Sequence, residues 1–212
     1  MRWLLVLLVL ALPVRAEEVV LGLSQDSIAI TTNFAGSEIL IYGAVKRDGP
    51  IVTDPPLQVI VTVAGPSRPV VVRRKERRFG IWVNTEAAEV DAAPSYYAIA
   101  TSAPWPETIS DTEDLRHRIT IPRAIRSVGS GVARPEDFTQ ALIRIRLKNG
   151  LYQLAEGAVT LRDHTLFETS VSLPANLTEG AYATRIYLTR DGAVVSRFET
   201  TIDVQKVGLE RW

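Results

Sequence analysis

Few residues of this 212-residue chain have the types and spacing that chemistry requires. The chain has no cysteine, and its only histidines are His117 and His164. A metal site needs three or four ligands, usually including a closely spaced pair, and neither histidine has a second histidine or a cysteine at such spacing. We therefore expect structural or solvent-facing roles for both histidines, and no metal or other cofactor.

Nucleophilic catalysis has equally little support. The sequence contains no G-x-S-x-G elbow, no H-E-x-x-H pair and no phosphate-binding P-loop. Asp111, Glu113 and Asp114 form a group of carboxylates, but acids clustered at the start of a helix normally cap that helix. The sequence therefore predicts a protein that is not an enzyme.

A run of basic residues is the sharpest concentration of charge, and we name it the basic cluster. Its members are Arg73, Arg74, Lys75, Arg77 and Arg78. One hypothesis makes it an anion-binding face for lipid headgroups or an acidic partner, because each basic residue near an anionic membrane contributes about 1 kcal/mol. The other makes it a solvated edge strand or hairpin, where basic residues discourage aggregation. Charge runs are commonly solvated faces, which favours the second hypothesis.

Trp82 follows the basic cluster, between Ile81 and Val83. It is a candidate aromatic anchor for a partner, because tryptophan is enriched at binding hot spots. In a protein built from two sheets, however, a tryptophan in a strand usually packs inside. We expect Trp82 to lie in the core.

A second basic set supports a rival function. Its members are Arg116, His117, Arg118, Arg123 and Arg126. If these side chains converge on a cleft between domains, they could clamp an oxyanion such as sulfite or a sulfonate, which would indicate a periplasmic oxyanion-binding protein or enzyme. A flat or self-paired arrangement would instead favour a non-catalytic interaction module.

The elements that position these residues read as mostly β. Apolar residues alternate with period two, which predicts half-buried strands. In the first half the expected strands lie at 28–34, 39–45, 59–63, 70–72, 81–83 and 96–101. Tyr96 follows a turn at the start of the last of these, which resembles a tyrosine corner, where the phenol bonds to the upstream backbone.

The second half begins with a predicted helix. Pro135, Glu136 and Asp137 are typical of a helix start, and Asn149-Gly150 supplies its end. Alternation over 143–147 also permits a strand, but the end signals favour the helix. Strands follow, with a second tyrosine corner at Tyr182 and a tight hairpin turn at Asp191-Gly192.

These patterns predict two immunoglobulin-like β-sandwich domains in tandem, the second smaller and carrying one helix. The first domain is expected at 17–104 and the second at 134–208. Between them, 105–133 forms a connector with short helical turns and a flexible Gly-Ser-Gly joint at 129–131.

The N-terminus predicts export. Arg2 precedes an apolar run from Leu4 to Leu12, and small residues end at Ala16, so residues 1–16 are expected to be a cleaved signal peptide. The run is shorter than the roughly 20 residues of a membrane span. The formal net charge of +0 and the exported location disfavour nucleic acid as a partner.

Five ordered segments carry a resemblance to a known family. They are RRKERRFGIWVN, DAAPSYYAIA, EDLRHRITIPRAIRSVG, NGLYQ and LPANLTEGAYATRIYLTRDGAVV. As a set they are similar to the uncharacterised alphaproteobacterial "putative transmembrane protein" family. The resemblance implies an exported β-rich protein with one C-terminal membrane helix, held at the periplasmic face of the inner membrane, and an inner-membrane permease of the sulfite or sulfonate exporter type as a partner. It implies no activity and no catalytic residues.

The end of the sequence departs from the family's pattern. It stops at Leu209-Glu210-Arg211-Trp212, where the resemblance implies entry into the membrane. An Arg-Trp pair is typical of the membrane interface, so residues 209–212 are expected to be a juxtamembrane stub.

Overall fold

The computed structural model describes residues 17–25, 27–30, 36–127 and 134–206. The predicted signal peptide at 1–16, the joint at 129–131 and the stub at 209–212 lie outside the described residues. Within them the protein is mainly β, which confirms the predicted fold class.

One sheet has four antiparallel strands in the order β1-β3-β10-β9. Their bounds are β1 Glu17–Leu23, β3 Ser37–Arg47, β9 Thr160–Arg162 and β10 Leu166–Leu173. Alternate residues of β3 and β10 point inward, such as Ile39, Ile41 and Phe167, and all three are buried. The opposite face leaves Leu40 and Tyr42 exposed, so only one face of this sheet is in the core.

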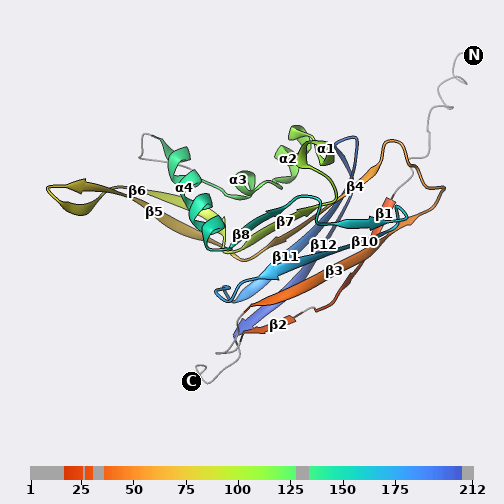
Figure 1. Cartoon of the computed structure of the whole chain (residues 1–212), viewed down its shortest axis with the longest axis horizontal. Helices are drawn as coiled ribbons and strands as arrows, with labels where there is room; N and C mark the ends of the chain where they lie inside the picture. Colours follow the sequence, from red (N-terminus) through yellow and green to blue (C-terminus); the bar gives the residue numbers. More distant parts are fainter. Residues whose placement is uncertain (1–16, 26, 31–35, 128–133, 207–212) are drawn as a thin grey trace, which may run out of the picture.

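The second sheet has six strands in the order β2-β12-β11-β4-β7-β8. Their bounds are β2 Ser27–Ile30, β4 Leu57–Ala64, β7 Tyr97–Thr101, β8 Tyr152–Ala155, β11 Gly180–Arg190 and β12 Ala193–Lys206. Its inner face contributes residues such as Val61, Ile186 and Ile202, each at most 1 % exposed. The two sheets share one apolar core (Figure 1).

The two halves of the sequence build these sheets together. β3 from the first half pairs with β10 from the second, and β4 pairs with β11. Strands of the predicted 17–104 and 134–208 domains are therefore neighbours in the same sheets, and the expected tandem of two immunoglobulin-like domains is not confirmed.

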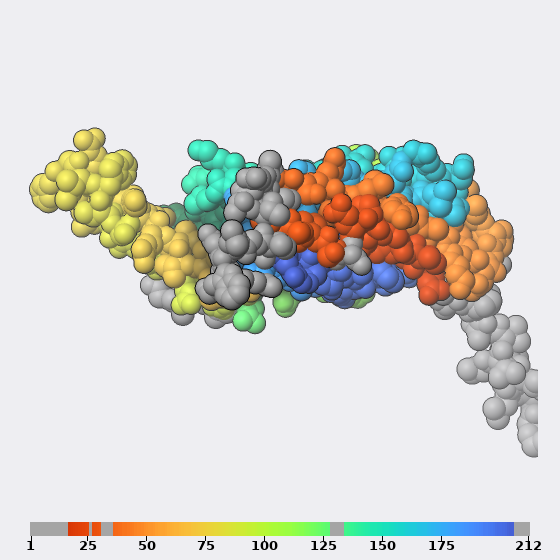
Figure 2. Space-filling view, turned by 90° about the horizontal axis from the view of Figure 1, so that it is seen from below, coloured from red at the N-terminus to blue at the C-terminus, as the bar shows by residue number. Residues whose placement is uncertain are grey.

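The remaining two strands leave the sandwich. β5 Ser67–Arg78 and β6 Ile81–Pro94 form a long antiparallel hairpin that pairs with no other named strand in the described chain. Figures 1 and 2 show it projecting away from the body of the molecule, and we name it the arm.

Four helices lie between β7 and β8. The three short ones are α1 Trp105–Thr108, α2 Asp111–His117 and α3 Ile121–Ala124. They are tied to the outer face of the six-stranded sheet, where the Thr189 hydroxyl donates to the Thr108 carbonyl and the Tyr97 phenol to the Ile119 carbonyl. The longer α4, Pro135–Lys148, confirms the predicted helix and packs at the base of the arm (Figure 1).

The turn predictions met different outcomes. Asp191 and Gly192 both have positive φ, as a two-residue hairpin turn requires, and the Tyr182 phenol donates to the Thr178 carbonyl upstream at 2.8 Å. The corner predicted at Tyr96 is wrong, because its phenol donates across the core to the Ser172 carbonyl of β10. A tyrosine beside a turn signals burial, but its hydroxyl takes whichever carbonyl the packing brings near.

Candidate functional site

The arm is a regular hairpin with a tight turn at its end. In the ladder Arg78 lies opposite Ile81 and Arg77 opposite Trp82. Phe79 and Gly80 form the turn, with φ of 49° and 86°. Two central residues with positive φ are typical of the type I′ turn, whose twist matches that of the paired strands.

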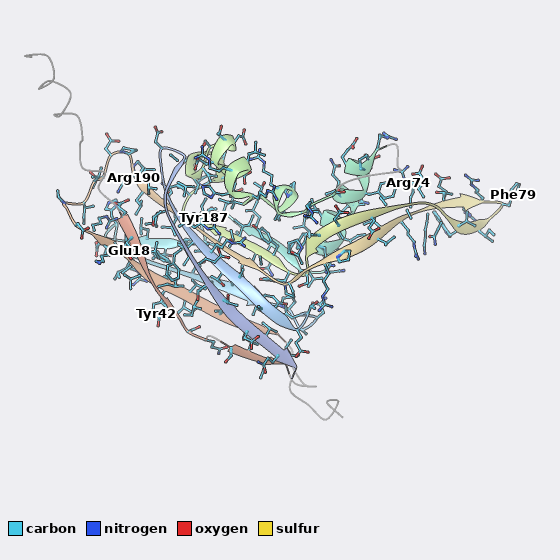
Figure 3. The ribbon with its side chains drawn as sticks, turned by 180° about the vertical axis from the view of Figure 1, so that it is seen from behind. Glu18, Tyr42, Arg74, Phe79, Tyr187 and Arg190 are labelled. Atoms are coloured by element: carbon cyan, nitrogen blue, oxygen red, sulfur yellow. The ribbon has the colours of Figure 1, made fainter. Side chains whose placement is uncertain are left out.

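Large apolar side chains at the arm's end are in solvent. The exposed fractions are 106 % for Phe79, 65 % for Ile81 and 68 % for Trp82. We name these three residues the tip. The expectation that Trp82 lies in the core is wrong, because Trp82 belongs to the part of β6 near the end of the arm and is mostly exposed. Figure 3 shows Phe79 at the far end of the arm, away from the body of the molecule.

The basic cluster lies directly behind the tip, on β5 itself. The strand expected at 70–72 therefore continues through the whole basic cluster. Five cations and one carboxylate, Glu76, leave a local charge of 5 − 1 = +4. Of the five, Arg73, Lys75, Arg77 and Arg78 are exposed. The positive charge of the basic cluster therefore lies next to the apolar side chains of the tip.

Arg74 is the member of the basic cluster that contacts the body of the molecule, whereas Arg77 and Arg78 contact only the Gly80 carbonyl and Glu76 of the arm itself. It pairs with Glu86 across the ladder at 3.0 Å and with Asp137 of α4 at 3.3 Å. Its guanidinium also lies over the Phe138 ring, 5.3 Å from the ring centre. Arg74 therefore joins the arm to the body, whereas the other four cations are presented to solvent.

The rival set of basic residues does not converge as a whole. Arg116 pairs with Glu113 at 2.6 Å, and Arg123 pairs with Asp114 at 2.7 Å. The Arg126 guanidinium lies 3.9 Å from Asp91 at the base of the arm. These three are paired with nearby carboxylates, as the reading of the chain as an interaction module expected.

His117 and Arg118 are different, because both line a cavity of about 430 Å³ on the outer face of the six-stranded sheet. Arg185 of β11 and Arg197 of β12 line it as well, beside the Tyr187 ring. We name it the arginine cavity. The His117 ring lies edge-on to Tyr187 at 5.5 Å, and the Arg197 guanidinium lies 5.9 Å from the same ring.

The tyrosines that line the arginine cavity, Tyr187 and Tyr97, are uncharged. Burial raises the pKa of the Tyr187 phenol, against the opposing charges of Arg197 and Arg185. Burial also raises the pKa of Tyr97. Both phenols remain protonated in the physiological range, so positive charge in this cavity comes from the arginines.

The carboxylates of α2 are structural, but they do not cap the start of the helix as the sequence predicted, because the Ser110 side chain accepts the capping bond from the Glu113 N–H. Asp114 is 2 % exposed and accepts from the backbone N–H groups of Ile119 and Thr120 at 3.0 and 2.8 Å. Glu113 lies beside Arg116 and His117. These bonds hold the α2–α3 segment against the sheet and leave no free carboxylate pair there.

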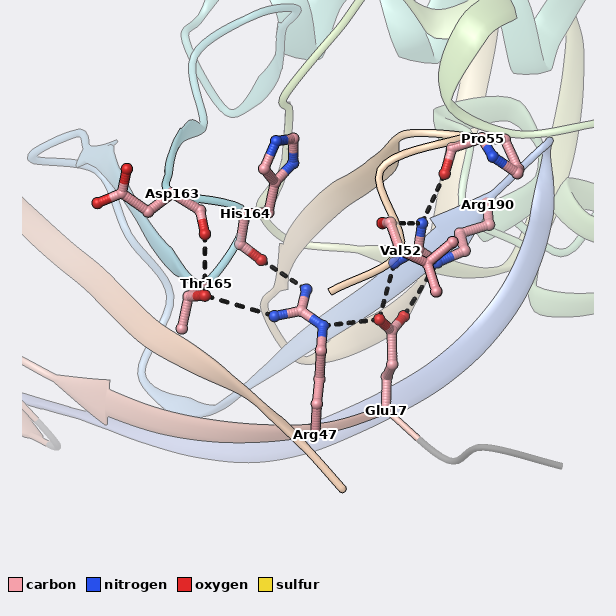
Figure 4. A network of polar contacts seen from close by, with 8 residues as sticks. All are labelled: Glu17, Arg47, Val52, Pro55, Asp163, His164, Thr165 and Arg190. Atoms are coloured by element: carbon pink, nitrogen blue, oxygen red, sulfur yellow. Dashed lines mark hydrogen bonds and ion pairs between the residues drawn. The ribbon is translucent and has the colours of Figure 1, made fainter. Parts of the chain in front are cut away.

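A second polar network closes the opposite end of the sandwich (Figure 4). Glu17 of β1 accepts from Arg47 and Arg190, each at 2.8 Å. Arg190 also donates to the carbonyl of Val52 at 2.9 Å, and Arg47 donates to the main-chain carbonyl of His164. The His164 side chain is exposed, so this histidine contributes backbone only. No group of three or more potential metal ligands occurs among the described residues.

Sequence reasoning missed Phe79, Arg185 and Arg197. Gly80, two residues after Arg78, was the available signal for a hairpin turn and hence for Phe79 at the end of the hairpin. Arg185 and Arg197 gave no local signal, because only the pairing of β11 with β12 brings them to one face.

Comparison with known families places the chain in a family. Residues 18–212 match the family described as "Putative transmembrane protein (Alph_Pro_TM)". A comparison with curated proteins found no match. In the described part of the chain, none of the helices has the length and apolar character needed to cross a membrane.

Proposed function

We propose a function for this chain, which belongs to the alphaproteobacterial "putative transmembrane protein" family. Its role in this proposal is that of a non-catalytic interaction module of the cell envelope. In this proposal the protein is exported, is tethered at the periplasmic face of the inner membrane, and uses the arm to dock onto the anionic membrane surface. The tip enters the interface between headgroups and acyl chains, and the basic cluster lies among the headgroups.

The exposure of the tip carries this proposal. Fully burying a side chain of this size is worth about 1.5–3 kcal/mol, and Phe79 has no apolar contact to offset its hydration. Tryptophan is enriched at membrane interfaces, where its ring is in an apolar zone and its N–H in a polar one. The chain therefore holds in water three side chains suited to an interface.

The basic cluster supplies the second signal for membrane binding. Because Arg74 is paired with two carboxylates of its own, the four exposed cations and Glu76 leave a charge of 4 − 1 = +3 for the membrane. At about 1 kcal/mol for each charge, this is comparable with the apolar contribution of the tip. Reversible membrane attachment commonly needs an apolar and a basic element together. A tethered protein needs only a weak contact, because the tether keeps the arm at an effective concentration in the mM range.

An inner-membrane permease of the sulfite or sulfonate exporter type is the protein partner that we propose beside the bilayer. Its periplasmic loops would meet the same arm, because tryptophan and arginine are the residue types most enriched at binding hot spots.

Co-sedimentation with vesicles tests the proposal. Phe79→Ser with Trp82→Ser removes the apolar tip, and Arg77→Gln with Arg78→Gln removes two exposed charges. On vesicles of phosphatidylethanolamine with phosphatidylglycerol, we expect the second pair to weaken binding roughly 30-fold, from about 1 kcal/mol per charge. Vesicles of phosphatidylcholine should bind the unmodified protein weakly.

Matched controls come from the body of the molecule. Leu115→Ser removes an apolar side chain that is 65 % exposed, and Lys46→Gln removes an exposed charge. Both controls should bind as the unmodified protein does. If both arm variants also bind unchanged, the membrane proposal fails. If the arm variants lose capture of the permease while the unmodified protein ignores vesicles, the partner of the arm is the protein.

A further inference from the structure

We propose that the arginine cavity binds a small organic molecule with one anionic head group and a compact apolar body. This site meets the arm only at its base, where Ser67 and Pro94 line it, and it goes beyond the docking function. Its volume of about 430 Å³ lies in the range of small-ligand pockets. It is formed by three arginines that come from α2, β11 and β12.

Arg118 is the cation most available to a ligand. It ends α2 in the left-handed conformation, with φ of 53° and ψ of 54°, where glycine is the usual residue. Its guanidinium has no ion-pair partner in the described part of the chain. A long cationic side chain at a strained helix end, lining a cavity, is better explained by a ligand than by helix stability.

Arg185 and Arg197 are held ready by a shared carboxylate. Glu199 accepts from Arg185 at 3.1 Å and also pairs with Arg197. Burial alone would raise the pKa of Glu199, but the hydrogen bonds and charges of Arg197 and Arg185 outweigh it and lower that pKa. Glu199 is thus ionised at neutral pH, and the three arginines keep a charge of 3 − 1 = +2 for an anion.

The remaining walls suit a small apolar body. Ala64 of β4 lies opposite Ala183 of β11, and with Ala181 these short side chains leave the space that the cavity occupies. The Tyr187 and Tyr97 rings bound it. An anion that reached the arginines would therefore rest its body on alanine methyl groups and neutral aromatic rings.

Benzoate, benzenesulfonate, inorganic sulfate and inorganic phosphate are the probes for this site. Isothermal titration calorimetry with the whole protein should show binding of the two aromatic anions. Their affinity should exceed that of the inorganic ions, which use the arginines but not the apolar walls. Comparing the affinities of benzoate and benzenesulfonate shows whether the site prefers a planar or a tetrahedral head group.

Two arginines of one helix end make a matched pair of variants. Arg118→Ala keeps the β-carbon and the backbone conformation, and it should weaken the aromatic anions at least about tenfold, because a charged hydrogen bond is lost. Arg116→Ala, two residues away and outside the cavity, should change affinity less than about twofold. Arg118→Lys, which keeps the charge without the planar fork, should give an intermediate value.

Failure of this site is distinguishable from failure of the arm. The variants of Phe79, Trp82, Arg77 and Arg78 should bind the aromatic anions as the unmodified protein does. Absence of binding by all four probes overturns the proposal, and so does equal affinity of Arg118→Ala and Arg116→Ala when circular dichroism shows both folded.

Discussion

Phe79 and Arg118 are two of the five non-glycine residues with positive φ in the described part of the chain, a conformation that glycine usually adopts. Phe79 turns the arm at φ of 49°, and Arg118 ends α2 at φ of 53°. The left-handed conformation costs roughly 1–2 kcal/mol for such residues. In each case the residue presents its side chain at a place where a partner could reach it, the end of the arm or the wall of a cavity. Strain at such positions is consistent with function rather than stability.

The variant Phe79→Gly separates the role of position 79 in the turn from its role as an apolar anchor. Glycine accepts the positive φ of the turn, so the free energy of unfolding should stay the same or rise by up to about 1 kcal/mol. Vesicle affinity should fall about tenfold, because one apolar anchor is lost. Urea unfolding and vesicle co-sedimentation check the two effects. A parallel loss of stability and binding would show that Phe79 serves the turn alone.

Glu17 gives a residue-scale prediction with a pH signature. Burial by itself raises the pKa of Glu17, but hydrogen bonds and charges from Arg190 and Arg47 outweigh it and hold that pKa below its ordinary value of 4.5. The network therefore contributes stability that is fully present above that value and is lost as pH falls through the lowered pKa.

Glu17→Gln should lower the free energy of unfolding at pH 7 by about 2 kcal/mol, since it leaves two buried guanidinium groups without their carboxylate. The difference from the unmodified protein should shrink in acid. Chemical denaturation at several pH values measures it, and a difference that is constant from neutral pH into strong acid would contradict the account.

At the scale of elements, the arm depends on α4. Phe138 is 4 % exposed and lies under the Arg74 guanidinium, and Asp137 pairs with that same arginine. The contact makes one side of the arm's base part of the core, while the far end projects into water. The orientation of the tip is therefore set at α4.

Phe138→Ala should cost about 3–4 kcal/mol of folding free energy, as for other buried phenylalanines. Amide exchange should rise first along β5 and β6, because their support on the body is lost, and less in β3 and β10. Leu147→Ala, at a half-exposed position of the same helix, is the control and should have little effect. Equal exchange increases throughout both sheets would argue against a local clamp.

The positions of strands and helices were easier to predict from the sequence than the pairing between strands. Alternation predicted the strands at 39–45 and 59–63, which are β3 and β4. Asp191-Gly192 predicted a hairpin, and Pro135 with its two acids predicted α4. Period two says which face of a strand is buried but not which strand lies beside it. The pairing of β3 with β10 joins residues more than 120 positions apart, as with Leu40 and Ser170, and leaves no local trace. The prediction that Trp82 lies in the core was wrong for the same reason, because alternation cannot distinguish a strand in the core from one that leaves the sheet.

At the scale of the whole molecule, both halves of the chain form one core. Residues 17–104 contain β3 and β4, but the partners of these strands, β10 and β11, come after residue 165. Residues 17–104 alone would expose the inner faces of both sheets. We predict that this fragment does not fold, and that its proton NMR spectrum shows no dispersion. A well-dispersed spectrum would restore the two-domain interpretation.

The central claim is that the tip enters an anionic membrane surface. Because the chain has no cysteine, Ile81→Cys creates a unique site for an environment-sensitive fluorophore between Phe79 and Trp82. On vesicles of phosphatidylethanolamine with phosphatidylglycerol, we predict that its emission shifts to the blue, while the same label at Leu115→Cys does not respond. A label at position 81 that reports water with and without these vesicles would contradict the claim.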